Sequence, residues 1–367
     1  MEGNEEILAD EHYGMEIGIY TLGDLVPDPQ SRKTIHASER LKEIIEAARM
    51  ADEAGLDVFG VGEHHRLDYA ISSPPVVLSA ISQVTKRIKL ASTTTVLGTV
   101  DPVRLFEDFA TLDLLSNGRA EVIAGRGAFV ESFSLFGYDL DNYDGLFEEN
   151  IDLFLKLNSN EKVTWNGHFR TPLFDAEISP RPVQKGIPFW VGAGGSLESA
   201  ERAGKFGTGL TMAILGGDPK RFKPLVDVYR QTSRESGHAP EDLKVAVTGH
   251  AFIGETTQQA KDEYYPYYAH YRDFFSKEQG RNHMGREEFE QLAGPDTALF
   301  VGSPQQIIEK ILTQYELFGH QRFIAQMDIG GMPFKKVAEN IEFLATKVAP
   351  VVRRETKNST LATQADK

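Results

Sequence analysis

The feature that most constrains the fold is an alternation of two kinds of segment along most of the 367-residue chain. Short segments rich in apolar and β-branched residues are typical of buried strands, and the segments between them carry apolar residues at helical spacing. Eight strands are expected at Met15–Tyr20, Asp57–Gly62, Ile88–Leu97, Arg119–Ala124, Ile187–Ala193, Gly209–Met212, Lys244–Phe252 and Arg322–Asp328.

Most of these strands are followed by an expected helix, which predicts parallel strands joined by right-handed crossovers. Eight such units fit a single α/β fold of the (β/α)8 type, a TIM barrel with insertions, better than an open doubly wound sheet. Residues 162–181 are expected to form a lid or insertion outside the barrel wall. The expected organisation is an acidic N-terminal extension (1–14), the barrel (15–352) and a polar C-terminal tail (353–367).

Composition excludes several classes of function. The formal net charge of -15 would repel nucleic acid, and no basic cluster reverses that field locally. The chain has no cysteine, which excludes disulfides, thiolate metal sites and a cysteine nucleophile. No apolar run approaches the roughly 20 residues that span a bilayer, and the N-terminus lacks the pattern of a signal peptide. A cytoplasmic protein is therefore expected.

In such a barrel the active site lies at the carboxyl ends of the strands. The clearest candidates there are Glu63, His64 and His65, which follow the second expected strand. Adjacent histidines on an extended segment point apart, and the chain offers no obvious remaining metal ligands, so no metal site is expected. A histidine that contacts a bound ligand is preferred, and a buried histidine bonded to backbone stays open. Other strand-end candidates are Tyr20, Thr94, Arg126, Gly194, Met212, His250 and Asp328.

Two of these strand ends could bind an anion. Residues 192–196 (Gly-Ala-Gly-Gly-Ser) follow a strand and open a helix, where free backbone N–H groups and the helix dipole favour a phosphate. The alternative is a tight strand-to-helix turn that needs small residues. Arg126 lies between Gly125 and Gly127, so a ligand could approach the backbone and accept two hydrogen bonds from the guanidinium. The alternative for Arg126 is a surface ion pair.

Several sequence blocks then occur in order between residue 15 and about residue 353. They are 54–57 (Ala-Gly-Leu-Asp) with 63–65 (Glu-His-His), 100–104 (Val-Asp-Pro-Val-Arg) with 107–108 (Glu-Asp), 113–119 (Asp-Leu-Leu-Ser-Asn-Gly-Arg), 125–127 (Gly-Arg-Gly) and 301–304 (Val-Gly-Ser-Pro). In this combination the chain resembles the bacterial luciferase-like monooxygenase family, the flavin-dependent TIM-barrel oxidoreductases.

The resemblance implies that reduced FMN binds at the strand ends and reacts with O2 to give a flavin C4a-hydroperoxide, which oxidises a small organic substrate. His64 of this chain matches the catalytic histidine of that family, and Arg126 matches the arginine that binds the FMN phosphate. The run Gly194, Gly195 and Ser196 matches a second phosphate contact. Thr93 and Thr94 match residues joined by a cis peptide bond beneath the flavin ring.

The expected substrate pocket contains Tyr20, Glu63, His65 and Met212. Aromatic residues in the loops expected to line the pocket (22–37, 66–73, 163–180 and 264–291) favour an apolar or aromatic substrate. The tyrosines between 264 and 271 are expected to pack a helix against a lid or a dimer contact. Family resemblance also implies a separate flavin reductase that supplies reduced FMN, and a homodimer formed through helices early in the chain. Two alternatives are a deazaflavin-dependent hydride-transfer enzyme on the same fold and a non-catalytic flavin-binding protein.

Overall fold

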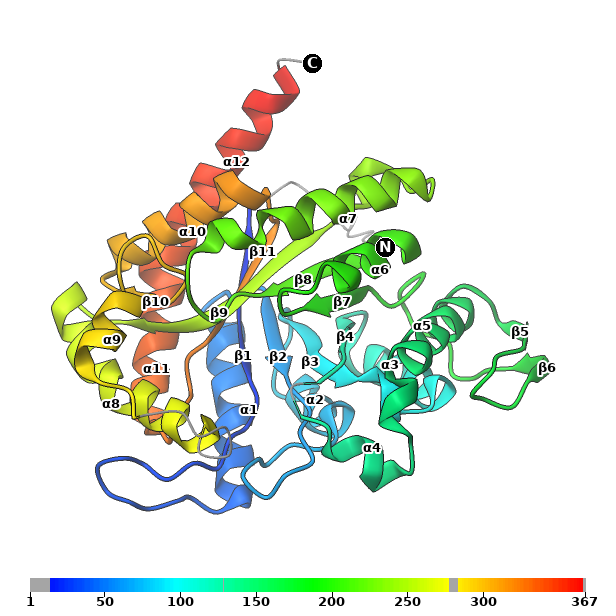
Figure 1. The fold of residues 1–367 in the computed structure, drawn as a ribbon, viewed down its shortest axis with the longest axis horizontal. Coiled ribbons are helices and arrows are strands. Elements are labelled where there is room, and N and C mark those ends of the chain that lie inside the picture. Colours follow the sequence, from blue (N-terminus) through cyan, green and yellow to red (C-terminus); the bar gives the residue numbers. More distant parts are fainter. Residues whose placement is uncertain (1–13, 128, 277–282, 366–367) are drawn as a thin grey trace, which may run out of the picture.

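A closed barrel of eight parallel strands forms the centre of the computed structural model, which describes residues 14–127, 129–276 and 283–365 (Figure 1). Each barrel strand pairs with two neighbours, and the pairing of β8 with β9 closes the ring. The (β/α)8 prediction is therefore confirmed. The barrel strands are β1 (Glu16–Thr21), β2 (Val58–Val61), β3 (Lys89–Val96), β4 (Ala120–Gly125), β7 (Phe189–Ala193), β8 (Gly209–Ala213), β9 (Val245–Ile253) and β11 (Arg322–Gln326).

Helices surround the barrel, and several of them, such as α3 and α10, bury apolar residues against its strands. In α3, for example, the Asp101 side chain accepts hydrogen bonds from the backbone N–H groups of Val103 and Arg104, and Asn117 ends the helix in the left-handed conformation. The helices are α1 (Ala37–Glu53), α2 (Pro74–Ser82), α3 (Pro102–Ser116), α4 (Glu131–Phe136), α5 (Tyr143–Ser159), α6 (Leu197–Phe206), α7 (Lys223–Glu235), α8 (Thr257–Ser276), α9 (Arg286–Leu292), α10 (Pro304–Phe318), α11 (Phe334–Phe343) and α12 (Ala349–Ala365).

Three short elements lie outside the barrel strands. An antiparallel hairpin of β5 (Lys162–Trp165) and β6 (Leu173–Glu177) projects from the barrel at the right of Figure 1, as the expected insertion predicts. The short strand β10 (Phe300–Gly302) extends the pairing of β9. The sequence patterns predict neither β10 nor α4, because both are too short to show a clear period.

A buried ion-pair cluster fills the amino end of the barrel. The Arg322 guanidinium contacts Glu121 (2.5 Å) and Glu16 (2.7 Å) and lies 4.6 Å from the centre of the Trp190 ring. Arg322 is 1% exposed, so these carboxylates compensate a fully buried charge. Among the described residues, no helix has both the length and the apolar character needed to cross a bilayer.

The two ends of the described chain pack against each other. The Met15 backbone N–H donates to Thr356 Oγ1 (2.9 Å), and Arg353 forms an ion pair with Asp57 (2.7 Å) at the start of the barrel wall. Helix α12 continues without interruption from Ala349 to Ala365. Residue 353, where a polar tail is expected to begin, therefore lies within a helix, and the expected division of the chain at this residue stays a prediction. Residues 1–13 of the expected N-terminal extension lie outside the described residues.

Candidate functional site

A cavity of about 420 Å³ opens at the carboxyl ends of the barrel strands. This volume falls within the range of roughly 300–1,000 Å³ that is typical of small-molecule and cofactor sites. Every barrel strand, or the loop that directly follows it, contributes to the wall. Residues that represent the eight strands in order are Tyr20, His64, Thr94, Arg126, Gly194, Thr211, His250 and Gln326.

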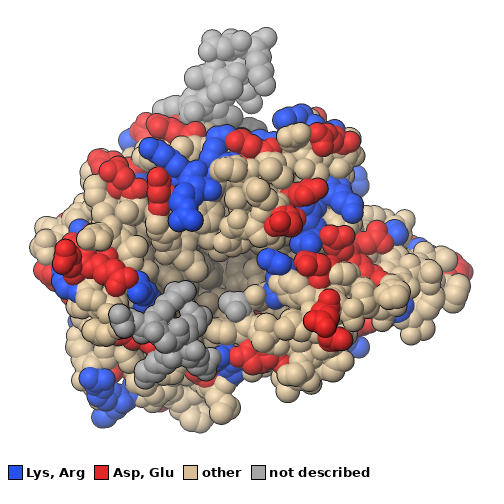
Figure 2. Space-filling model, in the orientation of Figure 1, with Lys and Arg blue, Asp and Glu red and all other residues tan. Residues whose placement is uncertain are grey.

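Figure 2 shows a hollow near the middle of one face of the molecule, and the visible walls of this hollow are mostly neither acidic nor basic. Tyr20, His64, Thr94, Arg126 and Gly194 all lie in the cavity wall, as the sequence predicts.

The peptide bond between Thr93 and Thr94 is cis, which confirms the prediction from the family resemblance. Both threonines line the cavity, and glycines on β2, β4 and β7 make room for them. A Cβ atom on Gly60 would lie 2.6 Å from the Thr93 side chain, one on Gly125 would lie 2.7 Å from Thr94 Oγ1, and one on Gly192 would lie 3.2 Å from Thr94 Cγ2. The sequence did not predict these glycines as a group, because only the pairing of the strands brings all three next to Thr93 and Thr94.

Four side chains at the floor of the cavity have buried polar atoms without a hydrogen-bond partner among the described residues. They are Thr93 on β3, Thr211 on β8, His250 on β9 and Gln326 on β11. Burying such atoms without a partner costs free energy, so they indicate a floor shaped for a polar ligand or for water. Sequence reasoning named Thr93 and His250 but missed Thr211 and Gln326, which alternate with apolar residues and carry no local motif.

His250 is neutral at physiological pH. Burial lowers the pKa of His250 to about 4, and nearby Gln326 opposes part of this shift. A neutral imidazole offers one donor and one acceptor, and both of its ring nitrogens lack a hydrogen bond in the described part of the chain. The His250 ring therefore can hydrogen-bond to a ligand that lies on the floor.

His64 lies at the edge of the same floor. Its backbone N–H donates to Ile71 O (2.9 Å), and its ring packs 4.0 Å from Tyr69 and 5.2 Å from Phe129, measured between ring centres. Burial lowers the pKa of His64 to about 4, against the opposing effect of Asp68 and Glu131. The neutral imidazole in the cavity wall can therefore accept a proton from a bound ligand.

His65 does not line the cavity. Its Nε2 atom contacts Glu63 Oε1 (2.8 Å), and its ring packs against the edge of Phe136. Glu63 does line the cavity, and its second oxygen accepts a hydrogen bond from Val96 N–H (2.9 Å). The prediction of His65 in the substrate pocket is wrong, because neighbouring residues on this extended segment point in opposite directions.

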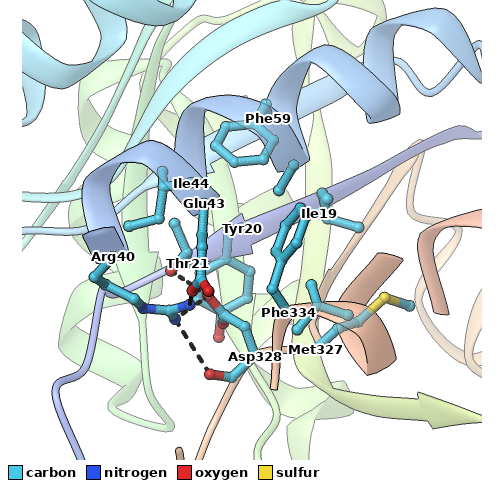
Figure 3. Close-up of a pocket in the computed structure, with 12 residues that line it drawn as sticks. Ile19, Tyr20, Thr21, Arg40, Glu43, Ile44, Phe59, Met327, Asp328 and Phe334 are labelled. Carbon is cyan, nitrogen blue, oxygen red and sulfur yellow. Dashed lines mark hydrogen bonds and ion pairs between the residues drawn. The ribbon is translucent and has the colours of Figure 1, made fainter. Parts of the chain in front are cut away.

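Met212 is also absent from the cavity wall. Its side chain is fully buried in the core between the barrel and the helices, while the flanking residues Thr211 and Ala213 face the cavity. Successive side chains of a strand alternate between its two faces. Assigning the cavity face of β8 to Met212 was therefore wrong by one residue. Asp328 likewise lies outside this cavity, in a separate buried cluster with Arg40 (Figure 3).

At one end of the cavity, Arg126 faces the region before α6. Its guanidinium lies 5.0 Å from the centre of the Tyr143 ring and 3.7 Å from Asp144, and the side chain remains about one-third exposed. Gly194 and Ser199 share this wall. A Cβ atom on Gly194 would meet no described atom within 4 Å, so protein packing does not demand a glycine there.

Gly195 and Ser196 do not line the cavity itself. Gly195 has a φ of +126°, a conformation that favours glycine, and Ser196 caps α6 by accepting a hydrogen bond from Ser199 N–H (3.3 Å). The Ser196 hydroxyl also donates to Glu198 (2.7 Å). These two residues therefore shape the turn that presents Gly194 and the start of α6 to the cavity.

Another part of the cavity wall is aromatic. Tyr69, Phe129, Tyr271 and Phe275 line it. The loops expected to surround the site include three of these residues, whereas nothing in the sequence indicated Phe129. Among the described residues, no group of three or more histidine, aspartate and glutamate side chains is arranged to hold a metal ion.

Comparisons with known proteins place this geometry in context. A family model described as luciferase-like monooxygenase matches residues 15–321. The alkanal monooxygenase alpha chain of the Kryptophanaron alfredi symbiont is 24% identical over 86% of this chain and 94% of its own length. The oxygenase component of a flavin-dependent trigonelline monooxygenase from Acinetobacter baylyi is 23% identical over 92% of this chain and 95% of its own length.

Solved structures share the fold at similar identities. A monooxygenase from Streptomyces bottropensis superimposes with a TM-score of 0.78 at 23% identity, covering 92% of this chain and 99% of its own. The oxygenating constituent of 3,6-diketocamphane monooxygenase from Pseudomonas putida, solved in complex with FMN, has a TM-score of 0.74 at 20% identity and covers 92% and 98%. An F420-dependent secondary alcohol dehydrogenase has a TM-score of 0.70 at 17% identity and covers 92% and 99%.

Proposed function

The chain belongs to the luciferase-like monooxygenase family, and we propose that it is the oxygenase of a system that uses reduced FMN and O2 to oxidise a small organic substrate. The observation that carries the proposal is the cavity itself. Its wall combines a guanidinium beside the start of a helix, buried polar atoms that have no partner among the described residues, and a cluster of aromatic rings. A flavin mononucleotide has matching groups, with a phosphate at one end and a flat polar-edged ring at the other.

The residues present fit this cofactor. Arg126 would hold the phosphate by charge, and backbone N–H groups at Gly194 and the start of α6, which the turn at Gly195 and Ser196 positions, would hydrogen-bond to it. Thr93 and Thr94 would support the ring, and the unpaired groups of His250 and Gln326 would meet its polar edge. When bound, reduced FMN supplies the activation of O2, with one oxygen atom passing to the substrate and the other leaving as water.

The protein's own contributions are orientation, exclusion of water and proton transfer. His64 is neutral and lies where the floor meets the aromatic end, so its imidazole can accept a proton from the bound reactants and return it. The buried floor keeps bulk water away from the reacting groups. The route of oxygen transfer that the family resemblance implies stays a prediction.

A titration of the protein with two coenzymes tests the proposed cofactor. We expect FMN to bind more tightly than a deazaflavin coenzyme, and oxidation of a substrate to incorporate oxygen from labelled O2 only when reduced FMN is supplied. Tighter binding of the deazaflavin, with hydride transfer and no incorporation of oxygen, would instead support the deazaflavin-dependent alternative. Binding of FMN without any turnover across a panel of aldehydes, alkanes, sulfonates and aromatics would support a flavin-binding protein.

Replacement of Arg126 by alanine should weaken FMN binding by about 1.5–3 kcal/mol, the scale of a charged hydrogen-bond partner. Riboflavin lacks the phosphate, so its binding to the same variant should stay unchanged. Fluorescence quenching of both flavins measures the two dissociation constants. Arg104→Ala, on the outer surface of α3, is the matched control. An unchanged constant for FMN, or an equal loss for riboflavin, would contradict a phosphate role for Arg126.

We also propose a separate reductase and a homodimer. The trigonelline relative is an oxygenase component, which supports a partner that delivers reduced flavin. Exposed apolar residues on α2, in the turn after it and on α3 offer a surface for a second copy: Val76, Val84, Leu114 and Leu115 are 42–68% exposed. Light scattering of the purified protein measures the dimer directly. The cytoplasmic location stays a prediction.

A further inference from the structure

Four aromatic side chains form a contiguous surface at one end of the cavity, and we refer to Tyr69, Phe129, Tyr271 and Phe275 as the aromatic wall. The Tyr69 and Phe275 rings are stacked, with centres 5.5 Å apart and planes 23° apart. Phe129 lies 6.1 Å from Tyr69 and 6.2 Å from Phe275, and Tyr271 meets Phe275 edge-on at 4.8 Å. The aromatic wall is therefore a continuous cluster of rings held together by stacked and edge-on contacts.

Helix α8 connects the aromatic wall to the core. Tyr271 and Phe275 lie one turn apart on the same face of α8. Further back on the helix, Tyr264 stacks on Phe252 of β9 at 5.2 Å and is fully buried. A face that is anchored in the core at one end and reaches the cavity at the other holds its aromatic rings in fixed positions. The tyrosine-rich segment is therefore helical, as expected, and Tyr264 packs against β9 and α9, whereas the expected contact with a lid or a second copy stays a prediction.

His64 joins the aromatic wall to the polar floor, because its ring contacts both Tyr69 and Phe129. Arg126 and Gly194 line another part of the cavity, where the Arg126 guanidinium packs against Tyr143 and Asp144. A cofactor that is held by Arg126 and extends over the floor would therefore leave the aromatic wall for the second reactant. A substrate on the wall would lie beside the imidazole that we assign to proton transfer.

The charged groups around the aromatic wall are paired with one another. Arg66 forms ion pairs with Asp68 (3.0 Å) and Glu131 (2.8 Å), and its guanidinium covers the Phe129 ring at 4.6 Å. Glu63 has both oxygens engaged, one by His65 and one by the Val96 backbone N–H. Within the described residues, this end of the cavity therefore offers no unpaired charge to compensate an ionised ligand, and desolvation would penalise such a ligand.

We propose that the aromatic wall is the substrate subsite and that it selects a planar, uncharged aromatic ring over an open-chain aliphatic molecule. Flat rings gain offset-stacked and edge-on contacts with Tyr69, Phe129 and Phe275 that a flexible alkyl chain cannot form, and they lose less conformational freedom on binding. The use of this subsite in catalysis rests on the proposed monooxygenase function, whereas the preference for aromatic ligands follows from the wall alone.

Calorimetric titrations of the FMN-loaded protein with 2-naphthol, 1-decanol and 2-naphthoate test the proposal. The first two ligands have the same number of carbon atoms and one hydroxyl group, although the alkyl chain is the more hydrophobic of the two. We expect 2-naphthol to bind about ten-fold more tightly than 1-decanol, and charged 2-naphthoate to bind at least as weakly as 1-decanol. Equal affinities, or tighter binding of 1-decanol, would overturn the proposal.

Two variants place the preference on the aromatic wall. Phe129→Leu and Phe275→Leu should each weaken 2-naphthol binding about five-fold while the affinity for 1-decanol stays within about two-fold. Phe174→Leu, on the exposed hairpin strand β6, is the control that should change neither affinity. Survival of the full preference for 2-naphthol in both wall variants would contradict the assignment.

The same titrations separate this proposal from the proposed function. FMN binding is followed by flavin fluorescence, both with and without 2-naphthol. Failure of FMN to bind, together with an intact preference for 2-naphthol in the apoprotein, would remove the flavin proposal and leave the subsite. Displacement of FMN by 2-naphthol would show that the aromatic wall holds the flavin ring, which would overturn the substrate subsite.

Discussion

Replacement of His64 by alanine is expected to lower the rate of substrate oxidation about 100-fold, the lower end of what one acid–base group contributes. The side chain lies in the cavity wall beside two aromatic rings, and burial holds it in the neutral form. The dissociation constant of FMN should change little, because Arg126 and the α6 turn are assigned to the phosphate. Steady-state rates and FMN titrations on one preparation separate these two effects.

The pH profile gives the His64 prediction a second readout. An ordinary histidine titrates near pH 6.5, whereas burial lowers the pKa of His64 to about 4. The rate of the wild-type enzyme should therefore show no histidine limb between about pH 5 and 8. His36→Ala, on an exposed side chain at the start of α1, is the control. A His64→Ala enzyme that retains full activity would remove the catalytic role and favour a flavin-binding protein.

Replacement of Arg40 by methionine should lower the free energy of unfolding by about 3–5 kcal/mol, the cost of leaving buried carboxylates without their counter-charge. Arg40 lies on α1 and is 4% exposed. Figure 3 shows its guanidinium pointing at Asp328, with which it forms an ion pair of 2.6 Å. Asp24 at 3.7 Å and Glu43 at 3.6 Å share the same positive charge. Denaturant titrations followed by circular dichroism measure the loss.

The control for Arg40 is Arg49, which lies on the same helix and pairs with Glu46 and Glu53 at the surface. Exposed ion pairs contribute about 0–1 kcal/mol, so Arg49→Met should unfold at nearly the wild-type denaturant concentration. Equal midpoints for the two variants would contradict the importance of the buried cluster.

The buried cluster also predicts a dependence of stability on pH. Burial raises the pKa of Asp24 above its usual range, although Arg40 opposes this shift. A carboxyl group whose pKa is higher in the folded state binds its proton more tightly there. Its stabilising effect is therefore complete below the unfolded pKa near 4 and is lost as the pH rises through the folded value. The Arg40→Met variant should accordingly lose more stability at neutral pH than in mild acid.

The barrel was predictable because its strands are buried on both faces, and such strands read as apolar segments at regular intervals. The eight expected strands all occur, and their bounds differ from the structure by only a few residues. The prediction reached its limit where a single residue decides the direction of a side chain. Met212, which was expected in the pocket, lies in the core, whereas its neighbour Thr211 lines the cavity. In the same way His64 lines the cavity, whereas its neighbour His65 pairs with Glu63 outside it.

Contacts between distant segments were beyond prediction from the sequence. The Arg40 cluster joins α1 to the loop after β11, and Asp328 was expected at the active site instead. Phe129 follows a glycine-rich strand end and has no periodic neighbours, so only the folded chain reveals its contact with Tyr69 and Phe275. The three glycines beside Thr93 and Thr94 likewise gain meaning only from strand pairing.

Because the segments at the two ends of the described chain are in contact, the closed barrel does not require the chain to begin at β1. Gly14 lies against the Arg353 carbonyl, and Met15 is bonded to Thr356, although 341 residues separate the bonded pair. A short linker between these segments would leave every strand pairing intact. The chain could then be circularly permuted, with new ends in the β5–β6 hairpin outside the wall. The order in which the eight units are synthesised is thus separable from the shape that they form.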